Sequence, residues 1–490
     1  MAQYSAVPTS EEAADFHQSS SGNAPTSTFS FDEKPLSSAQ TRVQKCVAWC
    51  RNNARSFLPS YCQASRGGTG RKLRSTAYLD ALRGYASVFV YFVHVFPSTD
   101  QTNWRFIPFV STMFSGRGMV ALFFVISGYA LCYSLLLSMY KQDEGHLLNS
   151  LASSTFRRFT RLYGSTAVAL LIAFAMLRLQ LYDGMWSRDI YMDSFFEQFV
   201  DVLRDIWYSS NPFGNIHDLD IGISAKYLPQ TWTIPVEYRG SVMLFAFCTA
   251  FCKVSPRTRM AFTWLVIFAG FAWQTVYVSN FMFGLFIADL AIYRQQRHGL
   301  LAGTLPTSTT TLPDTDTPPP QSQSLRSKTL HTLLLLTGLY LLGQPWADDS
   351  LLFLNYPWPY LKSFARWYWN RYDVHTFWYG WGGFATVYAL EFYPALQRPL
   401  LARFSQYLGH ISFGIYLMHV PFGLGVKRIY LDVWRAEILG DGNLALFVVF
   451  LLTTAIVFTA GDYFTMLDAK VVRFARWLQG RVFVTWPTRH

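Results

Sequence analysis

The chain has 490 residues, of which 51% are hydrophobic, 18% aromatic and only 14% charged. A soluble protein carries about 25% charged residues, so the composition excludes an ordinary globular enzyme and favours a protein that crosses a membrane several times. The formal net charge is +11, but the basic residues lie in short loops between apolar runs, which is typical of cytosolic membrane loops and argues against nucleic-acid binding.

The first 76 residues contain no apolar stretch of the kind found in a cleaved signal peptide. Residues 1–41 are rich in Ser, Thr, Ala and acidic residues and are predicted to be disordered, whereas residues 42–76 are basic. We expect this region to lie in the cytosol, with Val43–Leu58 as a short helix at the membrane surface. The first membrane helix then acts as the targeting signal.

Ten apolar segments follow, most of them near the length that crosses a ~30 Å hydrocarbon core as a helix. They are 78–97, 118–140, 163–182, 229–252, 261–278, 280–293, 330–345, 375–396, 411–426 and 444–466, with a kinked pair around 279–280. Lys and Arg gather in the even-numbered loops, whereas the third loop is acidic. The sequence therefore predicts an all-α integral membrane protein, a polytopic bundle of about ten transmembrane helices with both termini in the cytosol.

These features divide the chain into a cytosolic N-terminal region (1–76), a transmembrane domain (77–469) and a cytosolic C-terminal tail (470–490). Within the domain, loop 303–327 is a Thr/Pro/Ser-rich linker of low complexity. Phe195–Tyr208, in the long outer loop, has the amphipathic pattern of a helix that lies on the membrane surface. The pattern is compatible with the endoplasmic reticulum, the Golgi or the plasma membrane.

The first membrane segment carries the strongest functional signal. It contains Asp80, Arg83 and His94, although each charge in such a segment costs at least a few kcal/mol and normally faces a bundle interior. Arg83 and His94 are eleven positions apart, which places them on one helical face and roughly 16 Å apart along the axis. An imidazole titrates near neutral pH, so His94 is a candidate general base. Asp80, three positions before Arg83, either pairs with it or contacts substrate.

Polar residues in four later segments are further candidates. Ser127 is one of the small residues of its segment, with Gly118 and Gly128, and is either a packing residue or a hydroxyl that acts as nucleophile or binds the acceptor. Arg158 and Arg161 share a helical face at the cytosolic end of a span, and suit either phosphates or anionic lipid headgroups. Glu237 follows a proline inside an apolar run and needs a partner there. His419 lies among aromatic residues and is equally compatible with core packing and substrate contact.

Other sequence patterns are missing or unremarkable. Asp289 and Glu391 lie near span ends, and we interpret them as residues of the membrane interface. The sequence has no HExxH, no P-loop, no Cys/His metal spacing and no GxGxxG, so we expect neither a metal nor a tightly bound cofactor.

Five stretches together resemble the acyltransferase 3 family of integral-membrane acyltransferases. They are LDALRGYASVFVYFVHVF with the Arg83–His94 spacing, GMVALFFVISGYAL, the RxxR of Arg158 and Arg161, TWTIPVE with Glu237, and LGHISFGIYLMHVP. The resemblance covers about residues 78–468. It differs at Ala121, where many bacterial relatives carry an acidic residue, and it lacks the extracytoplasmic domain that bacterial members often append. The long Ser/Thr/Pro segments are typical of a fungal member.

The resemblance implies O-acyl transfer, commonly from cytosolic acyl-CoA to a hydroxyl of a sugar, glycan or small metabolite. It implies that Arg83 and His94 are the functional pair and that Arg158 and Arg161 bind acyl-CoA, which is a co-substrate and not a resident cofactor. We expect His94 to act as general base, Arg83 to steer the pantetheine or stabilise charge near the thioester, and Glu237 or Asp80 to orient the site. Direct attack and an acyl-enzyme at His94 or Ser127 both remain open.

Two other functions fit parts of the pattern. A polytopic transporter or lipid-binding protein without chemistry would use Arg83, Glu237 and His94 as a translocation path, but the sequence shows none of the internal repeats that many transporters have. A membrane acyltransferase of another class, acting on lipids, would use His419 as the base. The partners expected in every enzymatic case are acyl-CoA, a hydroxyl-bearing acceptor and the bilayer.

Overall fold

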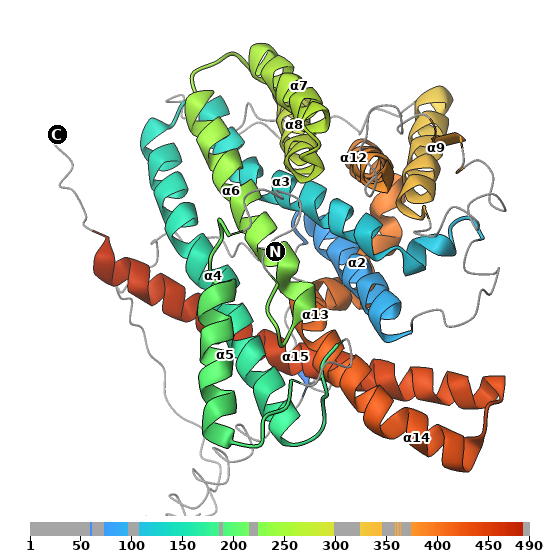
Figure 1. Ribbon diagram of the computed structural model, residues 1–490. Coiled ribbons are helices and arrows are strands. Elements are labelled where there is room, and N and C mark those ends of the chain that lie inside the picture. The colour runs from blue at the N-terminus through green and yellow to red at the C-terminus, as the bar shows by residue number, and fades with distance from the viewer. Residues whose placement is uncertain are drawn as a thin grey trace, which may run out of the picture. The chain divides into compact units, whose positions relative to one another are not determined.

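The computed structural model describes residues 59–60, 73–96, 107–185, 190–214, 224–297, 324–344, 358, 360–361, 363 and 374–483. The chain divides into one unit that ends at Arg71 and a second that begins at Lys72, and every element discussed below belongs to the second unit. Within these ranges the regular elements are all helical (Figure 1). The predicted surface helix Val43–Leu58 lies outside the described residues.

Eleven long helices make up the second unit within the part of the chain that is described. They are α2 (Ala77–Val95), α3 (Gly116–Tyr140), α4 (Glu144–Arg178), α5 (Phe195–Ser209), α6 (Thr233–Ala250), α7 (Pro256–Ala272), α8 (Val276–Arg297), α9 (Leu325–Leu342), α12 (Val374–Phe392), α13 (Arg403–Met418) and α15 (Asn443–Val482). Short 3₁₀ segments precede α3 and α6 (Ser111–Phe114 and Pro229–Trp232) and link α12 to α13 (Pro394–Leu401).

Each of the ten predicted spans contains a helix, and the predicted amphipathic helix corresponds to α5. Among the described helices, α3, α4, α8 and α15 are long and apolar enough to cross a membrane by length and composition. The all-helical architecture of the described residues is therefore observed with four candidate membrane helices, whereas the number of crossings and their orientation stay predictions.

Three boundaries differ from the sequence prediction. Helix α4 begins nineteen residues before the predicted start, because the Asp143 carboxylate caps it by accepting the backbone N–H of His146 at 2.9 Å. Helix α9 begins inside the predicted linker, where Ser324 caps it. The kink predicted at 279–280 is wrong, because α8 runs straight through these residues and the chain turns before Val276 instead.

Helices α2 and α13 cross at two glycines. A Cβ atom on Gly84 would lie 2.5 Å from the backbone nitrogen of Gly409, and one on Gly409 would lie 2.6 Å from the carbonyl carbon of Asp80. Only glycine fits such a contact, so the two backbones touch directly. Apolar side chains of α2, α13 and α15 bury the rest of this crossing; they are Val88, Tyr91, Val95, Leu408, Ile411, Ile415 and Val457.

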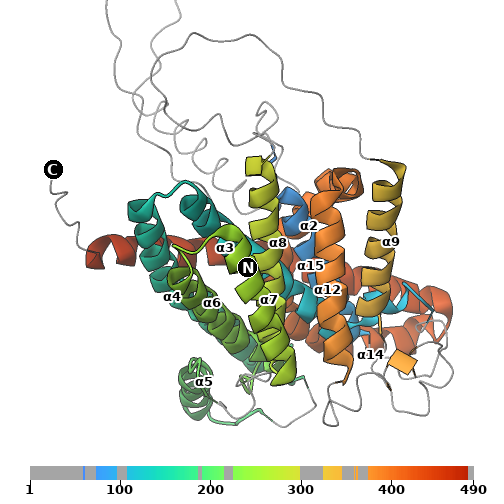
Figure 2. The ribbon, with the colours of Figure 1, turned by 90° about the horizontal axis from the view of Figure 1, so that it is seen from above.

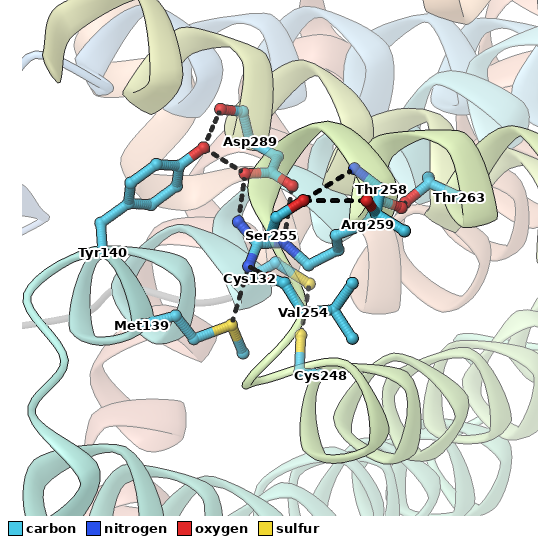
Figure 3. Close-up of polar contacts among 10 residues, drawn as sticks. All are labelled: Cys132, Met139, Tyr140, Cys248, Val254, Ser255, Thr258, Arg259, Thr263 and Asp289. Atoms are coloured by element: carbon cyan, nitrogen blue, oxygen red, sulfur yellow. Dashed lines mark hydrogen bonds and ion pairs between the residues drawn. The ribbon is translucent and has the colours of Figure 1, made fainter. Parts of the chain in front are cut away.

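A second group of helices packs on the other side of α3. Figure 2 shows α8, α12 and α9 side by side, and α3 contacts both α8 and α12. A buried ion pair joins α7 to α8, with Arg259 donating to both oxygens of Asp289 at 2.7 Å (Figure 3). The Tyr140 hydroxyl of α3 donates to the same carboxylate at 2.8 Å. Asp289 is therefore a structural residue buried between helices, and its predicted depth at the membrane interface stays a prediction.

Helix α13 widens where it reaches His419. It is followed by a π-helical segment, His419–Gly425, and then by the segments Lys427–Leu431, Asp432–Trp434 (α14) and Arg435–Leu439. Pro421 has no backbone N–H and cannot donate to the carbonyl of Leu417 four residues earlier. Such π segments occur frequently at functional sites.

Candidate active site

Arg83 is buried in the N-terminal half of α2 at 6% exposure. Its Nη1 donates to the Asp80 carboxylate at 3.2 Å, which is the pairing that their spacing allows. Its Nε has no hydrogen-bond partner among the described residues. A buried guanidinium N–H without a partner is costly, so the site retains a donor for a ligand oxygen.

A buried ion pair between α4 and α6 lies close to Arg83. Arg158 donates through Nη2 to the Glu237 carboxylate and through Nε to the Ser241 hydroxyl at 2.8 Å. Ser127 of α3 forms a further hydrogen bond to Glu237. The expectation that Glu237 needs a partner is confirmed, and the partner is an arginine that is 79 positions distant in the sequence.

Arg83, Arg158 and Glu237 form one electrostatic cluster. Arg83 interacts attractively with Glu237 and Asp80, and repulsively with Arg158. Two cations, from α2 and α4, and one anion, from α6, therefore meet inside the bundle. The sequence predicts this for residues that face an interior site. The two guanidinium groups of this cluster suit a polarised carbonyl oxygen of a ligand.

Arg161 does not share the surroundings of Arg158. Arg158 is 5% exposed and engaged inside the bundle, whereas Arg161, less than one turn further along α4, is half-buried. The two arginines therefore lie on one helix with different exposure, and their joint contact with acyl-CoA stays a prediction.

At the other end of α2, His94 lies against His419. The two imidazole rings stack with centroids 5.3 Å apart and planes inclined by 25°. His419 is fully buried, whereas His94 is half-buried and has no hydrogen-bond partner among the described residues. Two residues that are far apart in the sequence thus form one histidine pair between α2 and the end of α13.

The protonation of His419 is fixed by its backbone. Its Nδ1 lies 3.1 Å from the carbonyl oxygen of Ile415, and a carbonyl only accepts, so Nδ1 carries the proton. In the neutral ring Nε2 then holds the lone pair, and this atom has no partner in the described ranges.

The segment before α6 closes the site beside His419. The Tyr416 hydroxyl donates to the carbonyl of Gln230 and accepts from the Thr233 hydroxyl at 2.5 Å. Gln230 in turn donates through Nε2 to Leu417, the carbonyl that Pro421 leaves without an N–H, at 3.4 Å. The TWTIPVE stretch therefore contributes to both ends of the site, with Thr233 near His419 and Glu237 beside Arg158.

Helix α5 holds the same segment from outside. The Asp205 carboxylate accepts the backbone N–H groups of Lys226 and Tyr227 at 2.9 and 3.2 Å, and Asp201 accepts from the Lys226 ammonium at 2.7 Å. Burial raises the pKa of Asp205, while the two N–H donors oppose that rise. The polar face of α5 is thus bound to the protein, and Phe196 and Trp207 are exposed on its other face.

Sequence reasoning missed several participants. Ser241, Gln230 and Tyr416 are ordinary polar residues in helices, and only the meeting of α4, α6 and α13 gives them partners. Glu391, interpreted as interfacial, accepts from the Tyr78 hydroxyl at 2.5 Å and from Tyr129, so it joins α12 to α2 and α3. Glu391 follows an aromatic-rich run by three residues, and nothing in that sequence predicts these contacts.

An apolar groove lies along the opposite face of α2, and it contains none of the predicted site residues. It encloses about 330 Å³ and is lined by Leu82, Tyr85, Phe89, Leu339 and Leu390, among others. Leu82 and Phe89 point away from the helical face that carries Arg83 and His94. Among the residues that the structure describes, no three His, Cys, Asp or Glu side chains come together as a metal site requires.

Comparison with known proteins gives a consistent picture. The family model described as "Acyltransferase domain" matches residues 76–462. The chain is 26% identical to O-acetyltransferase PaAT-1 of Phomopsis amygdali, over 92% of this chain and 94% of that protein. It is 24% identical to Acyltransferase R4 of a Phoma species, over 70% and 82% of the two chains, and 24% identical to Acyltransferase clz18 of Cochliobolus lunatus, over 81% and 92%. No solved structure matches the chain.

Proposed function

Because this chain belongs to the acyltransferase domain family and is an acyltransferase, we propose that it moves an acyl group from acyl-CoA to a hydroxyl of a sugar, glycan or small-molecule acceptor. Acetyl is the proposed acyl group, since a relative that is similar over most of its length is named an O-acetyltransferase. The observation that carries the proposal is the histidine pair at one end of α2 and the arginine cluster at the other.

The donor end of the site is proposed to lie at the arginine cluster. The unpartnered Nε of Arg83 is a buried donor and suits a carbonyl oxygen of the pantetheine arm, because Arg83 lies too far along α2 from His94 for both to act on one thioester carbon. Glu237 and Arg158 hold each other in place and orient Arg83 by their charges. Phosphate contact is proposed for Arg161, which is more exposed than Arg158, with Arg158 adding its positive charge from the interior.

His94 is proposed to act as general base on the acceptor hydroxyl. It accepts the hydroxyl proton while the oxygen attacks the thioester carbon, and the new C–O bond forms as the C=O electrons move onto oxygen. When the tetrahedral intermediate collapses, the C–S bond breaks and the proton leaves with the CoA sulfur. His419, stacked on His94, stabilises the transient imidazolium through its ring face and locates the acceptor.

We favour direct transfer over an acyl-enzyme. Ser127, the candidate nucleophile, is buried at 4% exposure and bonds to a carboxylate that is itself paired with Arg158. Its hydroxyl therefore orients Glu237 and has no imidazole beside it that would activate it. The proposed setting is a multi-pass protein of the endoplasmic reticulum, the Golgi or the plasma membrane, with the acyl-CoA site open to the cytosol.

The experiment is acyl transfer by membranes that contain the full chain, with labelled acetyl-CoA as donor and a pool of alcohols as acceptors. Wild-type membranes should release CoA and form esters, and His94→Ala membranes with equal amounts of protein should not. Thermal protection of the purified protein by acetyl-CoA tests donor binding separately. If no CoA ester protects the protein and no ester forms, the transport alternative is favoured.

A further inference from the structure

The buried polar atoms without hydrogen-bond partners differ between the two ends of the site. At the arginine cluster the unpartnered buried atom is a donor, Arg83 Nε. Beside the histidines the unpartnered buried atoms are acceptors, His419 Nε2 and Gln230 Oε1. Both side chains are almost fully buried, Gln230 at 3% and His419 at 0% exposure. Buried acceptors without partners are rare, so each requires an explanation.

Neither acceptor is free to turn away. A carbonyl oxygen can only accept a hydrogen bond, so the NH₂ group of the Gln230 amide must face the Leu417 carbonyl. This fixes Oε1 as the outward atom. His419 is held in the same way, since its Nδ1 proton is committed to Ile415 and its lone pair is left on Nε2. Backbone carbonyls of one helical turn thus orient both acceptors.

The two side chains belong to one small region. Gln230 bonds to Leu417, two residues before His419, and its own carbonyl accepts from Tyr416. The Tyr416 ring centroid lies 6.1 Å from that of His419, and the His94 ring centroid lies 5.3 Å from it. The proposed base and the two acceptors are therefore all linked to the last turn of α13 and to His419, which follows it.

We propose that Gln230 and His419 form an acceptor-alcohol subsite that selects alcohols with a second hydrogen-bond donor next to the reacting hydroxyl, as in a 1,2- or 1,3-diol. The reacting O–H bonds to His94, and the neighbouring O–H satisfies Gln230 Oε1 or His419 Nε2. A site built to accept from a donor rejects analogues that lack it, because its own buried group is then left unpaired. This inference rests on the proposed function and names the substrate class of that site.

The test uses a library of alcohols in matched pairs, each a vicinal diol and its mono-methyl ether, with labelled acetyl-CoA and membranes that contain the full chain. The wild-type protein should acetylate the diols with kcat/KM at least tenfold above the ethers. Gln230→Met or His419→Phe, whichever removes the acceptor that the second hydroxyl uses, should bring the ratio close to one. Thr233→Val is the matched control, since it loses a neighbouring hydrogen bond to Tyr416 but should keep the ratio. Thermal unfolding checks that each variant is folded.

The outcomes separate the two proposals. If wild-type membranes acetylate no member of the library and release no CoA, the proposed function fails and the subsite falls with it. If they acetylate diols and ethers equally well, acyl transfer stands and the subsite is overturned. If the diol preference survives in Gln230→Met and also in His419→Phe, the preference arises elsewhere and the subsite is again overturned.

Discussion

The imidazole rings of His94 and His419 stack on each other at 5.3 Å, although 325 positions separate them in the sequence. One ring comes from the end of α2 and the other from the point where α13 widens. The half-buried ring is open to a ligand, while the fully buried ring is fixed by a backbone carbonyl. This division of roles leads to the first two predictions.

Replacing His94 with Ala should lower kcat of acyl transfer by about 10²–10⁴-fold, the usual contribution of a general base. His146→Ala is the control, because His146 is an exposed residue near the start of α4. CoA release by membranes with matched protein levels measures the effect. Unchanged activity in His94→Ala would exclude the general-base role.

His419→Phe and His419→Ala should both lower activity, but His419→Ala should destabilise the protein more. Phenylalanine keeps a ring against His94 but removes both nitrogens, so the protein should stay folded with a raised KM for the acceptor. Alanine also leaves a cavity, which costs about 2–5 kcal/mol for a large buried side chain, so its thermal midpoint should fall further. Equal KM values in wild type and His419→Phe would contradict the acceptor contact.

Breaking the pair between Arg158 and Glu237 should destabilise the protein strongly. Arg158→Met or Glu237→Gln leaves one charge or acceptor unpaired in the interior, which costs about 3–5 kcal/mol for a buried pair. The double variant Arg158→Met/Glu237→Leu removes both groups and should recover much of that loss. Thermal unfolding in detergent measures the series, and a double variant that is as unstable as the sum of the singles would refute the pairing.

Arg161→Ala should raise KM for acetyl-CoA by about tenfold, in line with the loss of one charge-assisted phosphate contact. Its kcat should change little, since Arg161 lies outside the cluster of Arg83, Arg158 and Glu237. Arg157→Ala is the matched control, because its Nε donates to the Ser153 carbonyl of the preceding helical turn. Equal KM values for the two variants would remove Arg161 from the donor site.

Gly409→Ala should destabilise the protein and lower its yield in membranes, because the new Cβ would lie 2.6 Å from backbone atoms of Asp80 that cannot move aside. Gly480→Ala, on α15 with nothing within 4 Å, should be neutral or stabilise the helix by up to about 1 kcal/mol. Thermal midpoints measured for both variants decide the matter, and equal midpoints would show that α2 and α13 are not in backbone contact.

The apolar segments and their helical character follow from the sequence because a bilayer demands long apolar helices whose backbone groups are satisfied internally. The same demand makes Arg83, His94 and Glu237 conspicuous, since charges there are costly. Boundaries were harder to predict. The start of α4 depends on the cap at Asp143, and a polar amphipathic stretch before an apolar one gives no hydropathy signal.

The partners within the site were not predictable in the same way. Nothing in the spacing of Glu237 indicates Arg158, and nothing in that of His419 indicates His94, because both contacts depend on how helices cross. Pro421 has no N–H, so the Leu417 carbonyl is left to accept from Gln230. Tyr416 contacts Gln230 at the same turn, and the sequence alone indicates neither contact. The sequence therefore identifies which polar residues are costly to bury in an apolar segment, and the tertiary structure decides which of them contact each other.

The contact between Gly84 and Gly409 limits how substrates reach the site. Where two backbones touch, no side chains remain between them to change rotamer, so α2 and α13 are expected to move together as a rigid body. Each contributes one histidine, and their spacing is preserved whatever the surrounding bundle does. Any gate that admits acyl-CoA or the alcohol must therefore open through displacement of helices other than these two.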